Sequence, residues 1–185
     1  MEFYFGKNLW KELKDYFESA KEIIIVTPFI SKHFAEYLIN KYESGKKIFL
    51  ITSNEKISFH QEALSKLQRR KILYIRFFVL SFLTAIFLLL SFVNLFFLIF
   101  TLIFAFLLLK FSFKKEFIIP TIIFGKDNFI HAKIYIIDRK IIIASSANFT
   151  YKGLKENYEF FTKMHDERIA EDIIKKLEKI LKIKI

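Results

Sequence analysis

The chain has 185 residues, of which 54% are hydrophobic and 26% charged, and its formal net charge at pH 7 is +11. Such an apolar chain is not intrinsically disordered, and four Gly and two Pro exclude a collagen-like sequence. Without Cys there is no disulfide framework, zinc–thiolate site or thiol nucleophile, which fits the cytoplasmic side of a cell. The positive charge suggests an anionic partner, such as nucleic acid or an acidic membrane surface.

Helices and strands alternate in the first 71 residues. Apolar residues at helical spacing predict a helix over Asn8–Ala20, and the β-branched run Glu22–Thr27 predicts a buried strand that ends at Pro28. The elements expected next are a helix from Ser31 to Ser44, a strand over Lys47–Thr52 and a helix over Ser58–Lys71. Strand, helix, strand and helix in this order are typical of a parallel α/β sheet.

An apolar run of 33 residues, Phe77–Leu109, contains no charged side chain. As one helix it would be roughly 50 Å long, whereas the hydrocarbon core of a bilayer is roughly 30 Å thick. With its weakly polar flanks, Ile72–Phe113, the run has 42 residues, enough for two spans of about 20. The sequence therefore predicts a transmembrane helical hairpin that reverses near Ser91–Asn94.

Basic residues flank both ends of the apolar run: Lys66, Arg69, Arg70, Lys71 and Arg76 before it, and Lys110, Lys114 and Lys115 after it. The positive-inside rule then predicts a multi-pass protein of the cell membrane with two spans and with both termini and the water-facing domain in the cytoplasm. Topology explains about eight basic residues in this way, which weakens the net charge as evidence for nucleic acid. The alternative, a buried helix pair in a soluble core, is disfavoured because such helices rarely lack a polar face.

The part after the apolar run is predicted to be rich in strands. Pro120 makes Phe117–Phe124 an edge strand, and two further strands are joined by the turn residues 138–140. The remaining elements expected are strands over Phe129–Ile137, Ile141–Ser145 and Tyr158–Lys163 and a helix over Asp166–Leu181. We therefore divide the chain into residues 1–71, the first half of an α/β domain, 72–113, the hairpin, and 114–185, the second half with the candidate site.

Polar side chains with the chemistry of phosphoryl transfer lie on these last strands. His131 and Lys133 are two residues apart on a predicted strand, so both should point to one face. Ser146 and Asn148 are also two apart, at the end of the next strand, and Glu159 on a third strand would hold the imidazole. A nucleophilic nitrogen with an oriented ring, surrounded by cationic and amide donors, is what phosphoryl transfer requires.

The spacing of these residues resembles the phospholipase D superfamily, whose core motif is H-x-K-x4-D-x6-G-S-x-N. The motif stands here as His131, Lys133, Asp138, Ser145, Ser146 and Asn148, with Ser145 where the family usually has Gly. A later Asn-x-Glu is matched by Asn157 and Glu159. The resemblance implies a single α/β domain with a mixed or parallel sheet flanked by helices, interrupted by the hairpin. Both halves must then lie on one side of the membrane, which an even number of spans achieves.

The resemblance also implies a role for each residue. His131 would attack phosphorus and form a phosphohistidine, Lys133 and Asn148 would bind the phosphate oxygens with help from Ser146, and Glu159 would accept the other ring N–H of His131. Asp138, seven residues from His131, would face the other side of the sheet, so we expect a structural role for it. No metal or other cofactor is implied.

The family uses two such motifs, and this chain has one. His33, His60 and His165 have no Lys two residues later. Single-motif members of the family form homodimers in which two motifs meet, so we expect a homodimer with a shared active site.

Three functions are compatible with the sequence. The favoured one is a membrane-anchored, metal-independent phosphodiesterase that acts on nucleic acid, because single-motif homodimers of the family are typically endonucleases. The alternative is a phospholipase D or phosphatidyltransferase that acts on membrane phospholipid. The third is a catalytically inactive membrane scaffold.

Overall fold

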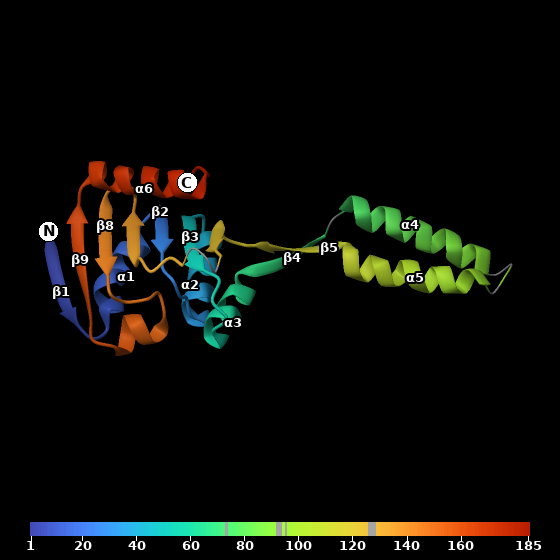
Figure 1. The fold of residues 1–185 in the computed structure, drawn as a ribbon, viewed down its shortest axis with the longest axis horizontal. Helices are drawn as coiled ribbons and strands as arrows, with labels where there is room; N and C mark the ends of the chain where they lie inside the picture. Colours follow the sequence, from blue (N-terminus) through green and yellow to red (C-terminus); the bar gives the residue numbers. More distant parts are fainter. Residues whose placement is uncertain (73, 92–93, 95, 126–128) are drawn as a thin grey trace. The chain divides into compact units, whose positions relative to one another are not determined.

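The computed structural model describes residues 1–72, 74–91, 94, 96–125 and 129–185 (Figure 1). The chain forms two compact units. One consists of Met1–Leu67 together with Phe117–Ile185, and the other of Gln68–Glu116. The first unit is thus assembled from two stretches of chain that meet where Ile118 N donates a hydrogen bond of 2.7 Å to Leu67 O.

A seven-stranded mixed sheet with the strand order β1-β9-β8-β7-β2-β3-β6 forms the centre of the first unit. Its strands are β1 (Glu2–Gly6), β2 (Glu22–Val26), β3 (Lys47–Ser53), β6 (Thr121–Phe124), β7 (Ile134–Ile137), β8 (Ile141–Ser145) and β9 (Glu159–His165). β2, β3 and β6 are parallel, whereas β7, β8, β9 and β1 are joined by antiparallel pairing. The mixed sheet agrees with the expected fold class, and the parallel arrangement is limited to three strands.

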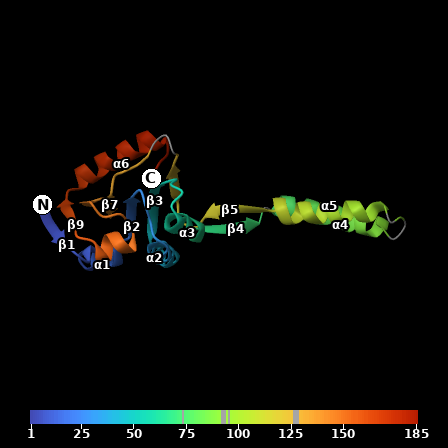
Figure 2. The ribbon, with the colours of Figure 1, turned by 60° about the horizontal axis from the view of Figure 1, so that its bottom comes forward.

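Helices cover both faces of this sheet (Figure 2). Ile23 and Ile25 of β2 pack in the core formed with α1 (Leu9–Ser19), α2 (Lys32–Glu43) and α3 (Ser58–Lys66). Ile24, which points the other way, packs with Ala170 and Ile174 of α6 (Glu167–Leu181). Because both faces are covered, β2 is apolar along its whole length, which is why it reads as a continuous β-branched run. Asp166 caps α6 by accepting hydrogen bonds from two main-chain N–H groups of its first turn.

Several elements of this unit differ from the prediction. Glu2–Gly6 is an edge strand that the sequence reading missed, although Phe3 and Phe5 alternate with Tyr4, which stacks on Phe161. The strand predicted from Phe129 begins only at Ile134. Residues 129–133 are not part of any strand. Finally, α3 ends at Lys66 instead of reaching Lys71, because the following residues enter a strand pairing of their own.

The second unit is a two-stranded sheet whose strands are connected by a helical hairpin. β4 (Gln68–Ile72) pairs with β5 (Phe113–Phe117), and α4 (Tyr74–Ser91) is followed by α5 (Phe96–Phe111). The helices pack through Phe87, whose ring lies 5.3 Å from that of Phe100 and 5.1 Å from that of Phe104. Of the predicted reversal near Ser91–Asn94, residues 92 and 93 lie outside the described residues.

The pair of transmembrane spans predicted for this segment is not found. Within the described part of the chain, no helix combines the length and the apolarity needed to cross a membrane. α4 has 18 residues and α5 has 16. The expectation of about 20 residues per span counted flanking residues that the structure places in β4 and β5. The helical hairpin is therefore present, and the predicted spans are corrected.

Candidate functional site

The segments that carry the motif residues meet at one edge of the seven-stranded sheet, where β2, β3 and β8 end and β7 and β9 begin. Ser145 N donates to Lys133 O over 2.9 Å, and Ser146 N donates to Phe160 O over 3.0 Å. Phe149 N reaches across to Thr27 Oγ1, 3.1 Å away at the end of β2. Because β7 lies between β8 and β2, the chain after β8 passes the start of β7 and brings Asn148 to the same edge as Lys133.

His131 and Lys133 lie in the segment that leads into β7. Lys133 Nζ is 3.4 Å from His131 Nδ1 and donates a hydrogen bond of 3.1 Å to His131 O. The two side chains are therefore neighbours, although through the bend of this segment and not through the strand alternation that the sequence predicted. Partial burial lowers the pKa of the Lys133 ammonium, and the negative charge of Glu159 opposes this shift. The exposed imidazole of His131 thus has a cation beside it.

Ser146 and Glu159 form a hydrogen-bonded pair beside these residues. Ser146 Oγ donates to the Glu159 carboxylate and accepts from Phe160 N over 3.0 Å. Asn157 Nδ2 donates to the same carboxylate over 3.3 Å. The carboxylate is not hydrogen-bonded to the His131 ring, so the expected contact between Glu159 and His131 is corrected. β8 separates β9 from β7, and two strand spacings amount to roughly 10 Å, so Ser146 at the end of β8 meets the carboxylate first.

Asn148 has a buried side-chain oxygen without a partner. Its Oδ1 makes no hydrogen bond in the structure. A buried acceptor left unpaired costs about 1–3 kcal/mol, so a donor brought by a substrate would be bound favourably here. The main chain of Asn148 packs against Gly153, where an added Cβ would lie 2.6 Å from Asn148 O. Gly153 therefore allows the turn that carries Asn148, a requirement that no motif in the sequence indicated.

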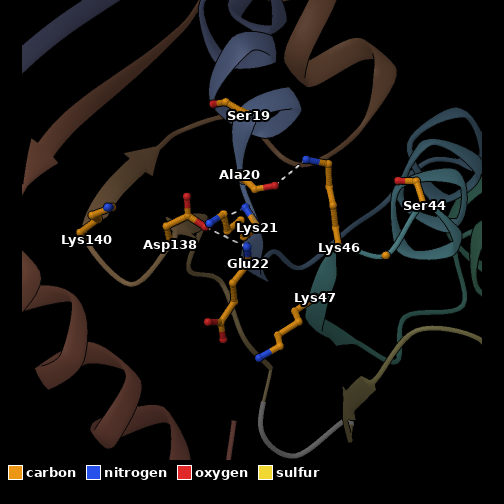
Figure 3. Close-up of a pocket in the computed structure, with 10 residues that line it drawn as sticks. Ser19, Ala20, Lys21, Glu22, Ser44, Lys46, Lys47, Asp138 and Lys140 are labelled. Carbon is orange, nitrogen blue, oxygen red and sulfur yellow. Dashed lines mark hydrogen bonds between the residues drawn. The ribbon is translucent and has the colours of Figure 1, made fainter.

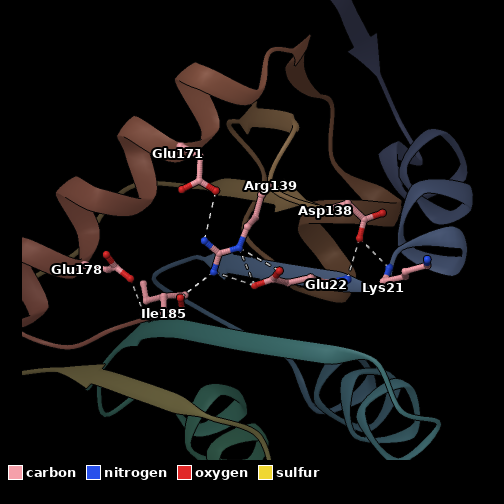
Figure 4. A network of polar contacts seen from close by, with 7 residues as sticks. All are labelled: Lys21, Glu22, Asp138, Arg139, Glu171, Glu178 and Ile185. Atoms are coloured by element: carbon pink, nitrogen blue, oxygen red, sulfur yellow. Dashed lines mark hydrogen bonds and ion pairs between the residues drawn. The ribbon is translucent and has the colours of Figure 1, made fainter.

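Asp138 lies at the opposite edge of the sheet, away from the other five predicted site residues, because it follows the last residue of β7. The four residues of β7 lie between it and Lys133, so the two Cα atoms are five residue steps apart, roughly 17 Å along the strand. Asp138 and Arg139 have φ of 49° and 55°, the conformation of a two-residue turn between twisted antiparallel strands. Asp138 Oδ1 accepts hydrogen bonds from Lys21 N at 2.8 Å and Glu22 N at 2.9 Å (Figures 3 and 4). These contacts fit the structural role expected for Asp138 from the sequence.

Arg139, next in the chain, ties this turn to α6 and to the end of the chain (Figure 4). Its guanidinium donates to both carboxylate oxygens of Glu22, to Glu171 at 3.3 Å and to the main-chain oxygen of Ile185 at 2.7 Å. Arg139 and Asp138 together hold the β7–β8 turn against β2 and α6, which positions the strand that leads back to His131.

Replacing Asp138 by Ala is expected to destabilise the fold. The N–H groups of exposed Lys21 and of partly buried Glu22 lose their acceptor, and a residue that tolerates positive φ is lost, so the free energy of unfolding should fall by about 1–3 kcal/mol. Asp138→Asn keeps an acceptor oxygen and should lose less. Urea unfolding followed by circular dichroism measures the difference, and equal midpoints for Asp138→Ala and the wild type would contradict this role.

A cavity of about 700 Å³ lies beside Asp138 (Figure 3). Its lining includes the four lysines Lys21, Lys46, Lys47 and Lys140. None of the other five predicted site residues lines it. α1 and α2 end here, so carbonyl groups with negative partial charge face the region, and Lys46 Nζ donates to Glu18 O over 2.7 Å. This arrangement satisfies helix ends and does not favour an anionic ligand.

His60 and a group of phenylalanines near His131 were not singled out by sequence reasoning. His60 is buried, accepts a hydrogen bond from Ile30 N at 3.2 Å and lies 2.8 Å from Ser53 O, so it is a structural side chain. Phe29, Phe59 and Phe129 come together next to His131 from three separate segments. Aromatic residues in such segments carry no spacing that would indicate their contact. Among the residues described, no group of three or more His, Cys, Asp or Glu side chains is placed to hold a metal ion.

One family model matches the second stretch of the chain. Residues 112–181 match the family model described as "Cardiolipin synthase, PLD-like domain". This stretch contains all six predicted site residues. A search of curated protein sequences found no match.

Solved structures share the fold. The phospholipase D family member Nuc from Salmonella typhimurium has a TM-score of 0.58 at 12% identity, with 96% of this chain and 91% of that chain covered. NucT from Helicobacter pylori has a TM-score of 0.52 at 16% identity, with 98% and 94% covered. Phosphatidylserine synthase from Haemophilus influenzae also has a TM-score of 0.52, at 14% identity, with 97% of this chain and 38% of that chain covered.

The chain therefore has the mixed α/β fold of phospholipase D-like proteins. The stretch that matches the phospholipase D-like domain, residues 112–181, contains His131, Lys133, Ser146 and Asn148, which meet at one edge of the sheet.

Proposed function

We propose that this protein is a metal-independent phosphodiesterase that cleaves nucleic acid through a phosphohistidine intermediate. The observation that carries the proposal is the gathering of His131, Lys133, Ser146 and Asn148 at one sheet edge, inside the stretch that matches a phospholipase D-like domain. An imidazole can act as the nucleophile in a displacement at phosphorus, and a cation and amide donors beside it can stabilise the charge on the phosphate oxygens.

The reaction takes two displacements. A ring nitrogen of His131 attacks phosphorus, a P–N bond forms, and the P–O bond to the leaving alcohol breaks as that oxygen takes up a proton. Water then attacks the phosphohistidine and gives its proton to the base that protonated the leaving oxygen in the first step. The P–N bond breaks to return the free imidazole, and the phosphate monoester leaves. Lys133 and Asn148 stabilise the charge on the phosphate oxygens in both steps. The Ser146–Glu159 pair holds the end of β8 against β9.

The structural matches support nucleic acid over phospholipid as the substrate. The chain corresponds to nearly the whole of Nuc and NucT, with 91% and 94% of those chains covered, and to only 38% of phosphatidylserine synthase. The second candidate is a phospholipase or phosphatidyltransferase, which the description of the matching family model favours.

A substrate panel separates these candidates. In EDTA-containing buffer with detergent, we expect the protein to cleave a labelled DNA or RNA oligonucleotide and to leave phosphatidylcholine and phosphatidylglycerol intact. Lys133→Met, which removes the cation but keeps the length of the side chain, should lower turnover by about 10²–10³-fold, as the loss of one preorganised donor does. Turnover of phospholipid alone would favour the second candidate, and no turnover of any substrate would favour an inactive scaffold.

We also propose that two copies share the active site. One chain supplies one imidazole at the site, and protonation of the leaving oxygen needs a second acid. A second copy related by a two-fold axis brings an identical His131 to the first and supplies that proton.

We further propose that the α4–α5 hairpin enters a lipid bilayer while the phosphodiesterase domain and both termini stay in the cytoplasm. Apolar side chains on both helices are exposed, with fractions of 68% for Phe82, 64% for Leu102 and 72% for Leu109. The hydroxyls of Thr84 and Thr101 donate to carbonyls of their own helices, which lipid requires of polar groups. Lys110 lies over the Phe106 and Phe111 rings at the charged end. Helices that are apolar on all sides must be surrounded by other apolar groups instead of water. The basic residues that flank the hairpin favour an anionic lipid surface.

Vesicle flotation tests the lipid contact. The wild type should float with phosphatidylcholine vesicles containing phosphatidylglycerol, and 1 M NaCl should not release it because the contact is apolar. Leu102→Asp combined with Leu109→Asp should leave most protein at the bottom of the gradient. Ile180→Asp, which changes an apolar side chain of 65% exposure on α6, is the matched control and should float. A wild type that stays at the bottom of the gradient with these vesicles would overturn this proposal.

A further inference from the structure

Three phenylalanine rings form a cluster beside the proposed nucleophile. The Phe29 ring, just after β2, lies 6.3 Å from that of Phe59 on α3 and 6.1 Å from that of Phe129. The Phe129 ring in turn lies 5.8 Å from the His131 imidazole. Phe59 and Phe129 are each 42% exposed, so the cluster presents apolar ring surface to the solvent next to the reacting nitrogen.

The cluster does not belong to the hydrophobic core. The core rings, such as Phe17, Phe34 and Phe149, are fully buried and pack on one another. Phe129, by contrast, is partly exposed and precedes β7 in a segment, residues 129–133, that carries no regular structure. Its ring is held by Phe29 on one side and by the His131 imidazole on another. A side chain that only filled the core would not be left at the edge where the phosphate is proposed to bind.

A second aromatic pair flanks the site on its other side. Phe5 stacks with Tyr158 at a ring distance of 6.2 Å, and Lys7 Nζ lies 4.7 Å from the centre of the Tyr158 ring. The pair belongs to this edge because Gly6 is paired with Glu159 in the sheet. Exposed rings interleaved with lysines on both sides of a phosphate site are the features of surfaces that bind unpaired bases.

We propose that Phe129, supported by Phe29 and Phe59, stacks the nucleobase next to the phosphate that His131 attacks. This inference rests on the proposed nuclease function and adds the substrate contact that function leaves open. An exposed ring within 5.8 Å of the imidazole is in reach of the base attached to the nucleotide whose phosphate is being attacked. Stacking is indifferent to the identity of the base, because every base has a π-face. In a duplex the same face is covered by neighbouring bases, so an unpaired base is the better occupant.

The proposal is tested with two oligonucleotides of the same length, one with ordinary bases and one with abasic residues throughout. For the ordinary oligonucleotide, Phe129→Ala should lower kcat/KM by about 5- to 150-fold, the range that about 1–3 kcal/mol of stacking per base corresponds to at about 1.4 kcal/mol per tenfold. For the abasic oligonucleotide the two proteins should be equal. Phe129→Trp, which keeps a stacking surface, should restore most of the loss. Phe106→Ala, which changes a 62% exposed phenylalanine on α5, is the control and should leave kcat/KM for both oligonucleotides unchanged.

An equal loss on both oligonucleotides would overturn the stacking role, because a merely structural change does not depend on the base. A loss confined to phospholipid turnover would also overturn it and would make the cluster an acyl-chain contact. Failure of the proposed function is recognised separately, because the wild type would then cleave neither oligonucleotide. In that case fluorescence anisotropy with the ordinary and abasic oligonucleotides still decides the inference, since tighter binding of the ordinary one must disappear in Phe129→Ala.

Discussion

His131→Ala is expected to lower turnover of an oligonucleotide by about 10⁴- to 10⁶-fold, which is the range seen when an enzyme loses its nucleophile. The imidazole is the group that bonds to phosphorus. Lys133, whose Nζ lies 3.4 Å from His131 Nδ1, cannot replace it because an ammonium group has no free electron pair. Rates measured in EDTA-containing buffer with excess enzyme give the ratio. Trapping of a covalent adduct on the wild type, identified by intact-protein mass, should fail with the variant.

The control for this variant is His165→Ala. His165 is the last residue of β9 and pairs with Ile141, so it lies at the edge of the sheet opposite to His131. Its removal should leave turnover within a factor of about two. Full activity of His131→Ala would falsify the phosphohistidine route and with it the proposed function.

The same variant tests the shared active site. If each site uses His131 from two chains, wild-type protein that exchanges subunits with an excess of His131→Ala loses activity in the mixed dimers. The wild type should sediment at about twice the chain mass of 22.2 kDa. A fully active monomer would contradict the proposal that two chains share the active site.

Gly153→Ala is expected to cause the largest loss of stability among small substitutions near the site. The new Cβ would lie 2.6 Å from Asn148 O and 3.1 Å from Asn148 N, both main-chain atoms that cannot move aside cheaply. Overpacking of this kind costs about 1–3 kcal/mol or more. Because the displaced atoms belong to Asn148, turnover should fall together with the urea midpoint.

Gly125→Ala is the matched control, since a Cβ at Gly125 meets nothing within 4 Å. Its urea midpoint should stay at or slightly above the wild-type value, because Ala reduces the freedom of the unfolded chain. A Gly153→Ala protein with an unchanged midpoint and unchanged activity would show that the turn at Asn148 relaxes without cost.

The site was predicted in part from local patterns. Residues two apart in sequence, His131 with Lys133 and Ser146 with Asn148, were expected to come together, and the structure places all four at one edge. The reason differs for the first pair, because His131 precedes β7 instead of lying in a strand. The position of Glu159 depends on the order of strands in the sheet, which periodicity does not reveal, and the intervening β8 leaves its carboxylate to Ser146.

By itself, the sequence determined the elements whose burial is periodic or continuous. The sequence predicted the β-branched runs at β2, β3 and β8, the apolar spacing of α1 and α6, and the uncharged stretch of the hairpin. Each of these patterns reflects the local environment of consecutive residues.

The tertiary structure alone decided contacts between residues distant in sequence. It paired Glu2–Gly6 with β9, placed Asp138 on the main chain of Lys21 and Glu22, joined β4 to β5 so that the hairpin helices became shorter than predicted, and gathered Phe29, Phe59 and Phe129 beside His131. These contacts depend on strand order and on loop closure, which are set by the packing of the whole sheet and leave no periodic trace in the chain.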